Sequence, residues 1–455
     1  MAGPNILLIT SDQQHWMTLG VLNPRIHTPN LDRLAAAGTL FQRAYCPNPT
    51  CTPTRASIIT GQYPSQHGAW TLGTKLPEST HCVGDDFHAA GYHTALIGKA
   101  HFQPLSGTDA YPSLEAYPVL HDLEFWRGFD QPFYGFRQVE LARNHTDEAH
   151  VGQHYALWME ERGCSNWRDY FRAPTGTRSS RAHAWELPEE YHYNTWIAER
   201  SCAQMDAALA ADRPFFIWSS FFDPHPSYCV PEPWASMYDP ADMELDDDFS
   251  IDELADKPPH FAMTQDPDAD WSPYRESGHY LHGMHYHGYD RAQLQRHKAV
   301  YYGMVSMMDH YIGRILEHLE AIGETDNTFV VFTTDHGHFI GEHGLSAKGP
   351  FLYEDMIRIP FIARWPGRIP AGATSDGIVS LVDLAPSFLA ASGLPIPRCM
   401  SGRDQSAAWC GDDAAYRDHA ICEHHHEPTT VHLKTFVEQR WKITVYYDRD
   451  HGELY

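Results

Sequence analysis

Four short runs of consecutive apolar residues stand out along the chain, and polar residues follow each run at once. The runs cover residues 5–10, 92–98, 215–222 and 328–334. They are rich in Ile, Val, Phe and Thr and are closed by Gly, Pro or Asp, which is typical of strands buried on both faces. We therefore predict four strands of one buried sheet.

A second pattern, with apolar residues at steps of three and four, precedes the last of these runs. Its members are Val300, Met304, Met307, Tyr311, Ile315 and Leu319. This spacing predicts a long amphipathic helix. Because strands alternate with helices, we expect a largely parallel sheet covered on both faces, which is an α/β/α sandwich.

The polar residues that follow the four runs are of types that carry chemistry. They are Ser11-Asp12-Gln13, Lys99-Ala100-His101, Asp223-Pro224-His225 and Asp335-His336-Gly337-His338. In open parallel sheets, ligands bind beyond the carboxyl ends of the strands. We therefore expect the four clusters to converge on one site.

The remaining segments do not follow this alternation. Residues 223–297 are rich in Pro, Asp, Tyr and His, which favours long loops over the site or a lid. Residues 435–439 and 441–447 predict two strands joined by a tight turn, and residues 424–426, all His, predict an exposed loop. We expect a catalytic α/β domain over residues 1–400 and a small antiparallel subdomain over 401–455, which is either complete or cut short.

The charge balance narrows the range of partners. The chain has 455 residues, with 33 Lys and Arg against 59 Asp and Glu, a formal charge of −26. Nucleic acids and anionic membranes bind basic faces, so we expect neither. A local cationic cluster can still bind an anion, because salt screens the distant charges.

The expected location follows from what the sequence lacks. No apolar run reaches the roughly 18 residues of a membrane span, and residues 1–5 lack the basic start of a signal peptide. The nine cysteines are scattered without paired spacing, which favours a reducing compartment. We predict a cytoplasmic protein, and the sequence leaves its oligomeric state open.

The sharpest local motif is Cys51-Thr52-Pro53-Thr54-Arg55, followed by residues 56–61 ending in Thr-Gly. This motif resembles that of the type I sulfatases in the alkaline phosphatase superfamily. Further similar stretches are Ser11-Asp12-Gln13, Gly98-Lys99-Ala100-His101, Asp223-Pro224-His225-Pro226, Asp335-His336-Gly337, Gly341-Glu342-His343-Gly344, Lys348 ahead of Tyr353-Glu354, and Val382-Asp383-Leu384-Ala385-Pro386. The resemblance implies an alkaline phosphatase-like fold and hydrolysis of a sulfate monoester to an alcohol and inorganic sulfate.

The resemblance also implies a modified nucleophile at residue 51. In that family the cysteine is oxidised to formylglycine, so a sulfatase-maturating enzyme is implied as a partner. The aldehyde hydrate offers one hydroxyl for attack on sulfur and a second whose deprotonation expels sulfate, which splits one hard step into two. Pro53 fits the first turn of a helix, so residue 51 would lie at a helix N-terminus that favours an anion. Arg55, one turn along, would hold the nucleophile or its charge.

One divalent metal is implied next to this nucleophile. By resemblance, its ligands are residue 51 and the set Asp12, Gln13, Asp335 and His336. The family often has a second acid in place of Gln13 and Asn in place of His336. Oxygen ligands suit Ca²⁺ first, with Mg²⁺ as an alternative, and the His336 nitrogen adds Mn²⁺.

Four cationic or titratable residues match family positions that contact the sulfate: Lys99, His101, His225 and Lys348. A sulfate ester spreads one negative charge over three oxygens, and cations stabilise its transfer. By resemblance, His101 takes the proton from the covalent hemiacetal, and His225, together with Lys348, protonates the leaving oxygen.

Two other functions stay open. Phosphonate monoester and phosphodiester hydrolases of the same superfamily also have Gln after the first Asp and an Asp-His pair. They usually lack the Lys and His found here at Lys99 and His101, and this pair favours sulfate. The second alternative is a non-catalytic protein that binds metals through some of its 31 histidines.

The alcohol part of the substrate is not identified by the sequence, and a sugar, aryl or small alkyl sulfate would each fit. One histidine-rich cluster is a candidate wall of its pocket or a second metal site, although we favour a solvated lid. Its members are His279, His282, His285 and His287, with Tyr280, Tyr286 and Tyr289.

Overall fold

The computed structural model describes residues 3–104, 106–109, 112–143, 150–172, 181–245, 249–275, 289–412, 415–426 and 429–455. Most of the histidine-rich cluster predicted as a lid lies outside the described residues. The members concerned are His279, Tyr280, His282, His285, Tyr286 and His287. Among the described residues, no helix combines the length and apolar character needed to cross a bilayer.

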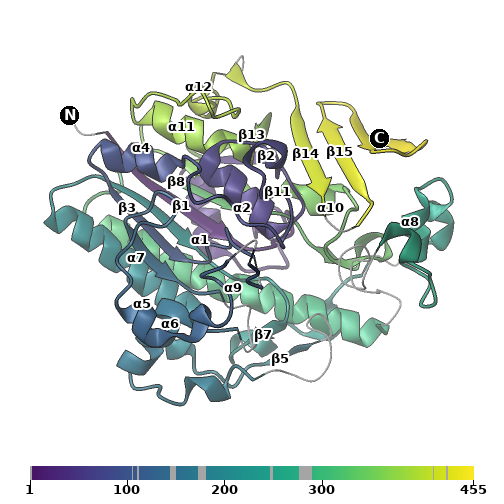
Figure 1. Ribbon diagram of the computed structural model, residues 1–455, viewed down its shortest axis with the longest axis horizontal. Helices are drawn as coiled ribbons and strands as arrows, with labels where there is room; N and C mark the ends of the chain where they lie inside the picture. The colour runs from purple at the N-terminus through teal and green to yellow at the C-terminus, as the bar shows by residue number, and fades with distance from the viewer. Residues whose placement is uncertain are drawn as a thin grey trace.

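A nine-stranded sheet runs through the centre of the molecule (Figure 1). Its strands follow the order β11-β2-β12-β8-β1-β6-β3-β4, and β13 pairs with β2. The pairs that involve β11 and β12 are antiparallel, and the other pairs are parallel. The strands are β1 (Asn5–Ser11), β2 (Thr39–Tyr45), β3 (His93–Gly98), β4 (Gln138–Leu141), β6 (Phe215–Ser220), β8 (Thr328–Thr334), β11 (Arg358–Ile359), β12 (Phe361–Arg364) and β13 (Ala373–Ser380).

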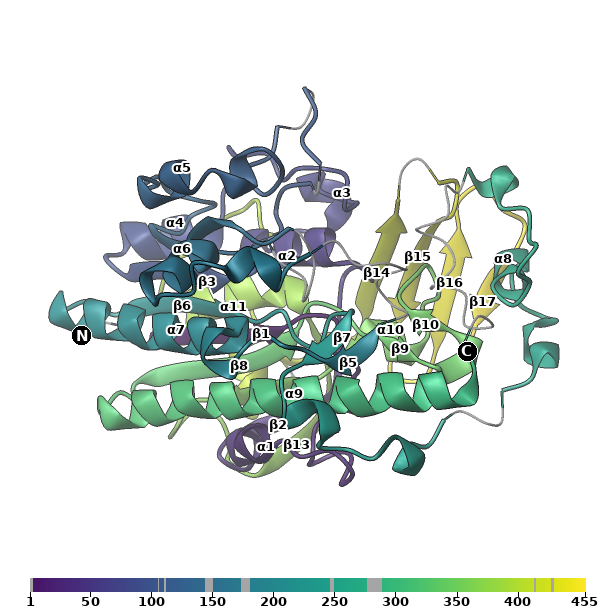
Figure 2. The same cartoon turned by 90° about the horizontal axis from the view of Figure 1, so that it is seen from below.

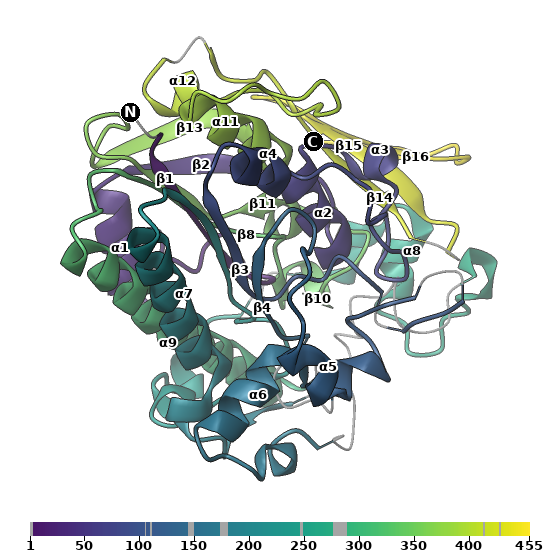
Figure 3. The ribbon, with the colours of Figure 1, turned by 60° about the vertical axis from the view of Figure 1, so that its left-hand side comes forward.

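Helices cover both faces of this sheet, as Figure 3 shows. One face carries α1 (Pro29–Ala36), α7 (Tyr193–Ala210) and α9 (Arg291–Ala321), and the other carries α2 (Cys51–Thr60), α4 (Val83–Ala89) and α11 (Leu384–Ala391). A hydrophobic core lies on each face of the sheet, and strand β1 contributes side chains to both. Ile6 and Leu8 lie in one core, and Leu7 and Ile9 lie in the other. This double burial explains its unbroken apolar sequence and confirms the predicted sandwich.

The four predicted strands correspond to β1, β3, β6 and β8, which are neighbours in the order β8-β1-β6-β3. The third strand ends at Ser220, two residues before the end of the apolar run. The run is longer than the strand because Phe221 and Phe222 are buried in the loop that follows. The predicted amphipathic helix is α9, which begins at Arg291 and has 31 residues. Because these four neighbouring strands run parallel, their carboxyl ends lie at a common edge of the sheet.

Shorter elements fill the segments between the main strands and helices. They are α3 (Pro64–His67), α5 (Leu123–Arg127), α6 (Gln153–Glu161), α8 (Pro259–Met263), α10 (Glu354–Ile357), α12 (Ser406–Trp409), and the strand pairs β5 (Ala182–Ala184) with β7 (Tyr228–Val230) and β9 (Phe339–Ile340) with β10 (Ser346–Ala347). The described part of 223–297 contains β7, α8 and the start of α9, joined by loops as predicted.

A four-stranded antiparallel sheet stands beside the main sheet at the C-terminal end (Figure 2). Its strands are β14 (Ala420–His425), β15 (His432–Val437), β16 (Lys442–Tyr446) and β17 (Gly452–Leu454). The two predicted strands are β15 and β16. The prediction of an exposed loop at residues 424–426 is wrong, because His424 pairs within β14 and both His424 and His426 are buried.

Candidate active site

Helix α2 places Cys51 at the carboxyl edge of the sheet, and all ten of its residues are buried. Cys51 is the first helical residue and Pro53 the third, so the missing N–H of Pro53 falls among those that lack an intrahelical partner. Asn48 organises the turn before the helix, because its side-chain oxygen accepts from the backbone N–H of Thr50 at 2.8 Å. The helix ends at Gly61, whose φ of 62° is the left-handed conformation common after helices. The sequence-based prediction of a helix N-terminus at residue 51 is confirmed.

Four buried side chains meet at this helix start. The ligand-type atoms of Asp12, Cys51, Asp335 and His336 all lie within 4.8 Å of one another. Cys51 Sγ is 3.5 Å from Asp12 Oδ1 and 3.2 Å from His336 Nε2. Asp12 follows β1, and Asp335 and His336 follow β8, so neighbouring strand ends meet as predicted.

The chemistry of these donors fits a divalent metal. His336 Nδ1 donates to the Gly337 carbonyl at 2.9 Å, because a carbonyl only accepts, and this leaves the Nε2 lone pair facing the cluster. Gln13 adjoins the cluster, since its backbone N–H donates to Asp335 Oδ1 at 3.0 Å. The side-chain Oε1 of Gln13 is buried without a hydrogen-bond partner, as expected for an oxygen that would bind a metal ion. Carboxylate, amide and imidazole donors suit Ca²⁺, Mg²⁺ or Mn²⁺.

Two cations pair with the two carboxylates, and a third lies against Cys51. Lys99 Nζ forms a fully buried ion pair with Asp12 Oδ2. Arg55 Nε donates to Asp335 Oδ2 at 2.9 Å, and its Nη1 donates to the Lys99 carbonyl and to Ser220 Oγ. Lys348 Nζ is 3.1 Å from Cys51 Sγ. The cluster is therefore locally positive although the chain is strongly acidic.

Burial and these charges shift the pKa values of the cluster. Burial raises the pKa of Asp12 to about 7, and Asp335 and Cys51 add to the effect. Burial also acts to raise the pKa of Asp335, but His336, Arg55 and Lys99 outweigh it, so this pKa is lowered. For Cys51, burial again opposes ionisation, and Lys348 and Lys99 overcome it to lower the thiol pKa. The site therefore favours negative charge at residues 335 and 51.

His101 lies at the end of β3, beside Lys99, and is buried. Its backbone N–H donates to Glu115 Oε1 at 2.7 Å, and Glu115 Oε2 accepts from the next two backbone N–H groups. Arg143 Nη2 donates to His101 Nε2 at 3.0 Å. Burial and the charges of Arg143 and Lys99 lower the pKa of His101 well below its ordinary value. The ring is therefore neutral at pH 7.

His225 follows β6 in a loop fixed from two sides. Its Nδ1 donates to the Pro226 carbonyl at 2.6 Å. Asp223, two residues before it, accepts from Tyr193 Oη at 2.5 Å and from Asn194 Nδ2 at 2.7 Å, both at the start of α7. The Asp223 carbonyl accepts from the Asp12 backbone N–H at 3.0 Å. Asp223 thereby ties the loop of His225 both to α7 and to Asp12, the residue that follows β1.

Two supporting residues escaped the sequence analysis. Arg143 follows β4, whose sequence Gln-Val-Glu-Leu is short and half polar, so no apolar run marks it as a strand. Glu115 lies in a loop, and only the three backbone N–H groups that it accepts from reveal its role. Because Glu115 does not come directly after an apolar run, nothing in the sequence marked it as part of the site.

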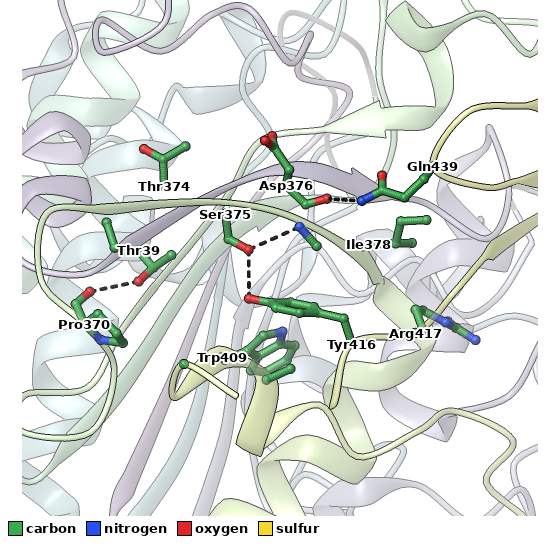
Figure 4. A pocket seen from close by; sticks show the side chains of 14 residues that line it. Thr39, Pro370, Thr374, Ser375, Asp376, Ile378, Trp409, Tyr416, Arg417 and Gln439 are labelled. Carbon is green, nitrogen blue, oxygen red and sulfur yellow. Dashed lines mark hydrogen bonds between the residues drawn. The ribbon is translucent and has the colours of Figure 1, made fainter. Parts of the chain in front are cut away.

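A cavity of about 470 Å³ lies elsewhere, between β13 and the segment that leads to β14 (Figure 4). Its polar groups bond one another: Ser375 Oγ donates to Tyr416 Oη at 2.8 Å and Gln439 Nε2 to the Asp376 carbonyl at 3.2 Å. The cavity is distinct from the strand-end cluster, which is the group of Asp12, Cys51, Asp335 and His336, because none of these residues lines it. We assign it no part in the chemistry.

Comparison with known proteins agrees with the geometry. Residues 4–394 match the sulfatase family, and residues 341–455 match the C-terminal region of N-sulphoglucosamine sulphohydrolase. The chain is 29% identical over 439 residues to an arylsulfatase of Clostridium perfringens, covering 92% of this chain and 81% of the relative.

Two solved structures share the fold. A phosphonate monoester hydrolase of Agrobacterium radiobacter superposes with a TM-score of 0.76 at 22% identity, over 99% of this chain and 89% of the other. A protein in complex with its substrate D-glucosamine-2-N,6-O-disulfate superposes with a TM-score of 0.71 at 22% identity, over 100% and 89%. Since the family match spans most of the residues and includes every residue of the strand-end cluster, the chain belongs to the sulfatase family of the alkaline phosphatase superfamily and is a sulfuric ester hydrolase.

Proposed function

We propose that this sulfatase cleaves a sugar sulfate monoester at the sheet edge where Asp12, Cys51, Asp335 and His336 meet. The observation that carries the proposal is the mutual approach of these four buried ligand-type side chains within 4.8 Å. A sugar is favoured as the alcohol because D-glucosamine-2-N,6-O-disulfate is the substrate of one protein with the same fold.

Two groups that the family implies would complete the site. When bound between Asp12, Gln13, Asp335 and His336, a divalent ion lowers the pKa of a nearby hydroxyl and polarises sulfuryl oxygens. Formylglycine at residue 51, made by a sulfatase-maturating enzyme, supplies a hydrate with two hydroxyls. We propose Ca²⁺ first, because three of the four proposed ligands offer oxygen, with Mn²⁺ and Mg²⁺ as alternatives.

The cations of the chain itself bind and orient the sulfate. Lys348 Nζ, 3.1 Å from Cys51 Sγ, lies where it can contact a group attached to residue 51. Lys99 and Arg55 each neutralise one carboxylate, so the charge of Lys348 leaves the pocket positive. The free N–H groups at the start of α2 add a partial positive charge. Negative charge that develops on the sulfuryl oxygens is thereby stabilised.

Two histidines are placed to move protons. His101 is neutral at pH 7, the form that accepts a proton, and Arg143 donates to its Nε2. A proton taken at this nitrogen would displace the Arg143 contact. His225 donates from Nδ1 to the Pro226 carbonyl, so the proton that it delivers to the leaving oxygen comes from Nε2.

A direct test compares the wild-type protein with Cys51→Ala, both co-expressed with a maturating enzyme. We expect the peptide that spans residue 51 to carry an aldehyde, and a panel of sulfated sugars to release sulfate with the wild type alone. Release of sulfate by Cys51→Ala at the wild-type rate would overturn the proposal.

Phosphonate ester hydrolysis is the second candidate, since Gln13 and His336 give a ligand set like that of phosphonate hydrolases and one such enzyme shares the fold. Comparing kcat/KM for an aryl sulfate and a phenyl phosphonate ester separates the two. Phosphonate turnover faster by orders of magnitude would reverse our choice. The alternative of a non-catalytic, histidine-rich metal-binding protein finds little support, because the described residues contain one cluster of His, Cys, Asp or Glu side chains close enough to hold a metal ion, and it lies at the candidate active site.

Two further predictions from the sequence are kept as proposals. A division at residue 400 is supported by the separate four-stranded sheet that begins at Ala420. A cytoplasmic location is supported by the nine cysteines, none of which is joined to another in a disulfide.

A further inference from the structure

Both the backbone and the side chain of Gln13 are held by contacts with other segments. Its backbone has a φ of 60°, which is uncommon outside glycine. Its N–H donates to Asp335 Oδ1 at 3.0 Å, and its carbonyl accepts from Tyr301 Oη at 3.1 Å. Its side-chain Nε2 lies 2.7 Å from His338 Nδ1, while Oε1 is buried without a partner.

His338 is itself fixed from two sides. Its Nε2 lies 2.8 Å from Tyr228 Oη, and its ring stacks on Tyr301 with centroids 5.1 Å apart and planes 7° apart. The side chain is fully buried. Tyr228 belongs to β7 and Tyr301 to α9, so elements distant in the sequence meet behind Gln13.

The two ends of an amide are opposite in function toward a cation. The oxygen can be a ligand, whereas the NH₂ group carries hydrogens that repel a cation. A neutral imidazole accepts at one nitrogen and donates at the other. When His338 carries its proton on Nε2, that N–H donates to Tyr228 Oη and Nδ1 accepts from the Gln13 amide. The opposite tautomer would attract the amide oxygen and turn the NH₂ group to the metal.

We propose that His338 is a positioning residue that, with Tyr228, sets the orientation of the Gln13 amide so that Oε1 faces the metal. This inference rests on the proposed role of Gln13 as a ligand. Tyr301 supports the pair twice, by stacking on His338 and by donating to the Gln13 carbonyl. Partners of this kind, which hold a ligand without touching the ion, typically change metal affinity by about 10–100-fold when removed.

The test measures the Kd for Mn²⁺ of the full-length protein, free of other metals, by titration. His338→Phe keeps a ring against Tyr301 but removes both nitrogens, and we expect its Kd to rise by about 10–100-fold. Tyr228→Phe keeps the Nδ1 acceptor and loses the hydroxyl that contacts Nε2, so a smaller rise is expected. His154→Phe removes another imidazole, which is half-buried on α6, and serves as the matched control with no expected change.

Two backgrounds distinguish positioning from packing. In Gln13→Ala, which has no amide to orient, adding His338→Phe should not weaken Mn²⁺ binding further. In Gln13→Glu, either carboxylate oxygen can face the ion, so His338→Phe should cost little. A purely structural role for His338 predicts the same loss in all three backgrounds. Circular dichroism and thermal unfolding of each metal-free variant identify any that fail to fold.

The tautomer is observable directly. A long-range ¹H–¹⁵N correlation spectrum distinguishes the protonated ring nitrogen, and the signals absent from His338→Phe identify residue 338. We expect a proton on Nε2 in the wild type. A proton on Nδ1, or wild-type affinity in His338→Phe while Gln13→Ala binds weakly, overturns the inference. Wild-type affinity in Gln13→Ala would instead remove Gln13 from the ligand set, which is a failure of the proposed site.

Discussion

Replacing Arg55 with methionine should strongly destabilise the metal-free protein. Arg55 is fully buried, and its guanidinium donates to Asp335 Oδ2, to the Lys99 carbonyl and to Ser220 Oγ. Methionine fills a similar volume but leaves the Asp335 carboxylate without the guanidinium that pairs with it. The loss therefore comes from an uncompensated buried charge and not from a cavity.

The magnitude follows from the burial of the pair. Both side chains have no exposed surface, and removing one partner of such a pair typically costs about 3–5 kcal/mol. Asp335 keeps the backbone N–H groups of Gln13 and His336, each at 3.0 Å, which places the expected loss near the lower end. Adding Asp335→Asn to Arg55→Met removes the unpaired charge and should restore part of the stability.

Urea unfolding in the presence of a chelator measures this loss as a lower midpoint at unchanged slope. Arg55→Lys keeps the charge but not the forked geometry, so it should lie between the wild type and Arg55→Met. Arg368→Met, at an exposed arginine, is the control and should change stability by no more than about 0.5 kcal/mol. An Arg55→Met midpoint equal to that of the wild type would refute the reasoning.

Three further outcomes are expected. Lys99→Ala should lower kcat for an aryl sulfate by about 10²–10³-fold, because the cation that faces Asp12 is lost; an unchanged kcat would exclude a role in the chemistry. Chelation should abolish sulfate release, and added Ca²⁺ or Mn²⁺ should restore it; full activity in excess chelator would contradict a metal role. Burial lowers the pKa values of His67 and His154 to about 4, so the unfolded chain binds protons at pH 5 that the folded protein does not. Stability should be full above about pH 6.5 and fall by about 3 kcal/mol per histidine by pH 4, and His154→Gln should flatten the curve.

The central sheet was predictable because its strands are buried on both faces. Ile6, Leu7, Leu8 and Ile9 alternate between two cores, so the strand is apolar at every position and stands out in the sequence. The edge strand β4 has one fully buried residue, Leu141, and gave no such signal. The histidines at 424–426 were misjudged because their burial depends on packing between β14 and distant segments, which no local pattern encodes.

The candidate site was predictable for a related reason. Parallel neighbours end at one edge, so Asp12, Lys99, His225 and Asp335 could be assigned to one place from four separate segments. The sequence could not show which side chains form ion pairs and hydrogen bonds with one another within the site. Arg55 donates to Asp335, to the Lys99 carbonyl and to Ser220 Oγ, and these partners lie on segments far from residue 55, so no local pattern could reveal them.

The depth at which residue 51 is held has a consequence for biosynthesis. Its side chain is 1% exposed, and every other residue of α2 is buried with it. The proposed maturating enzyme would have to reach this thiol, and the folded chain leaves almost none of it accessible. The proposed conversion to formylglycine would therefore precede folding of this segment. Protein that folds with its thiol intact would then stay unconverted until it is unfolded again.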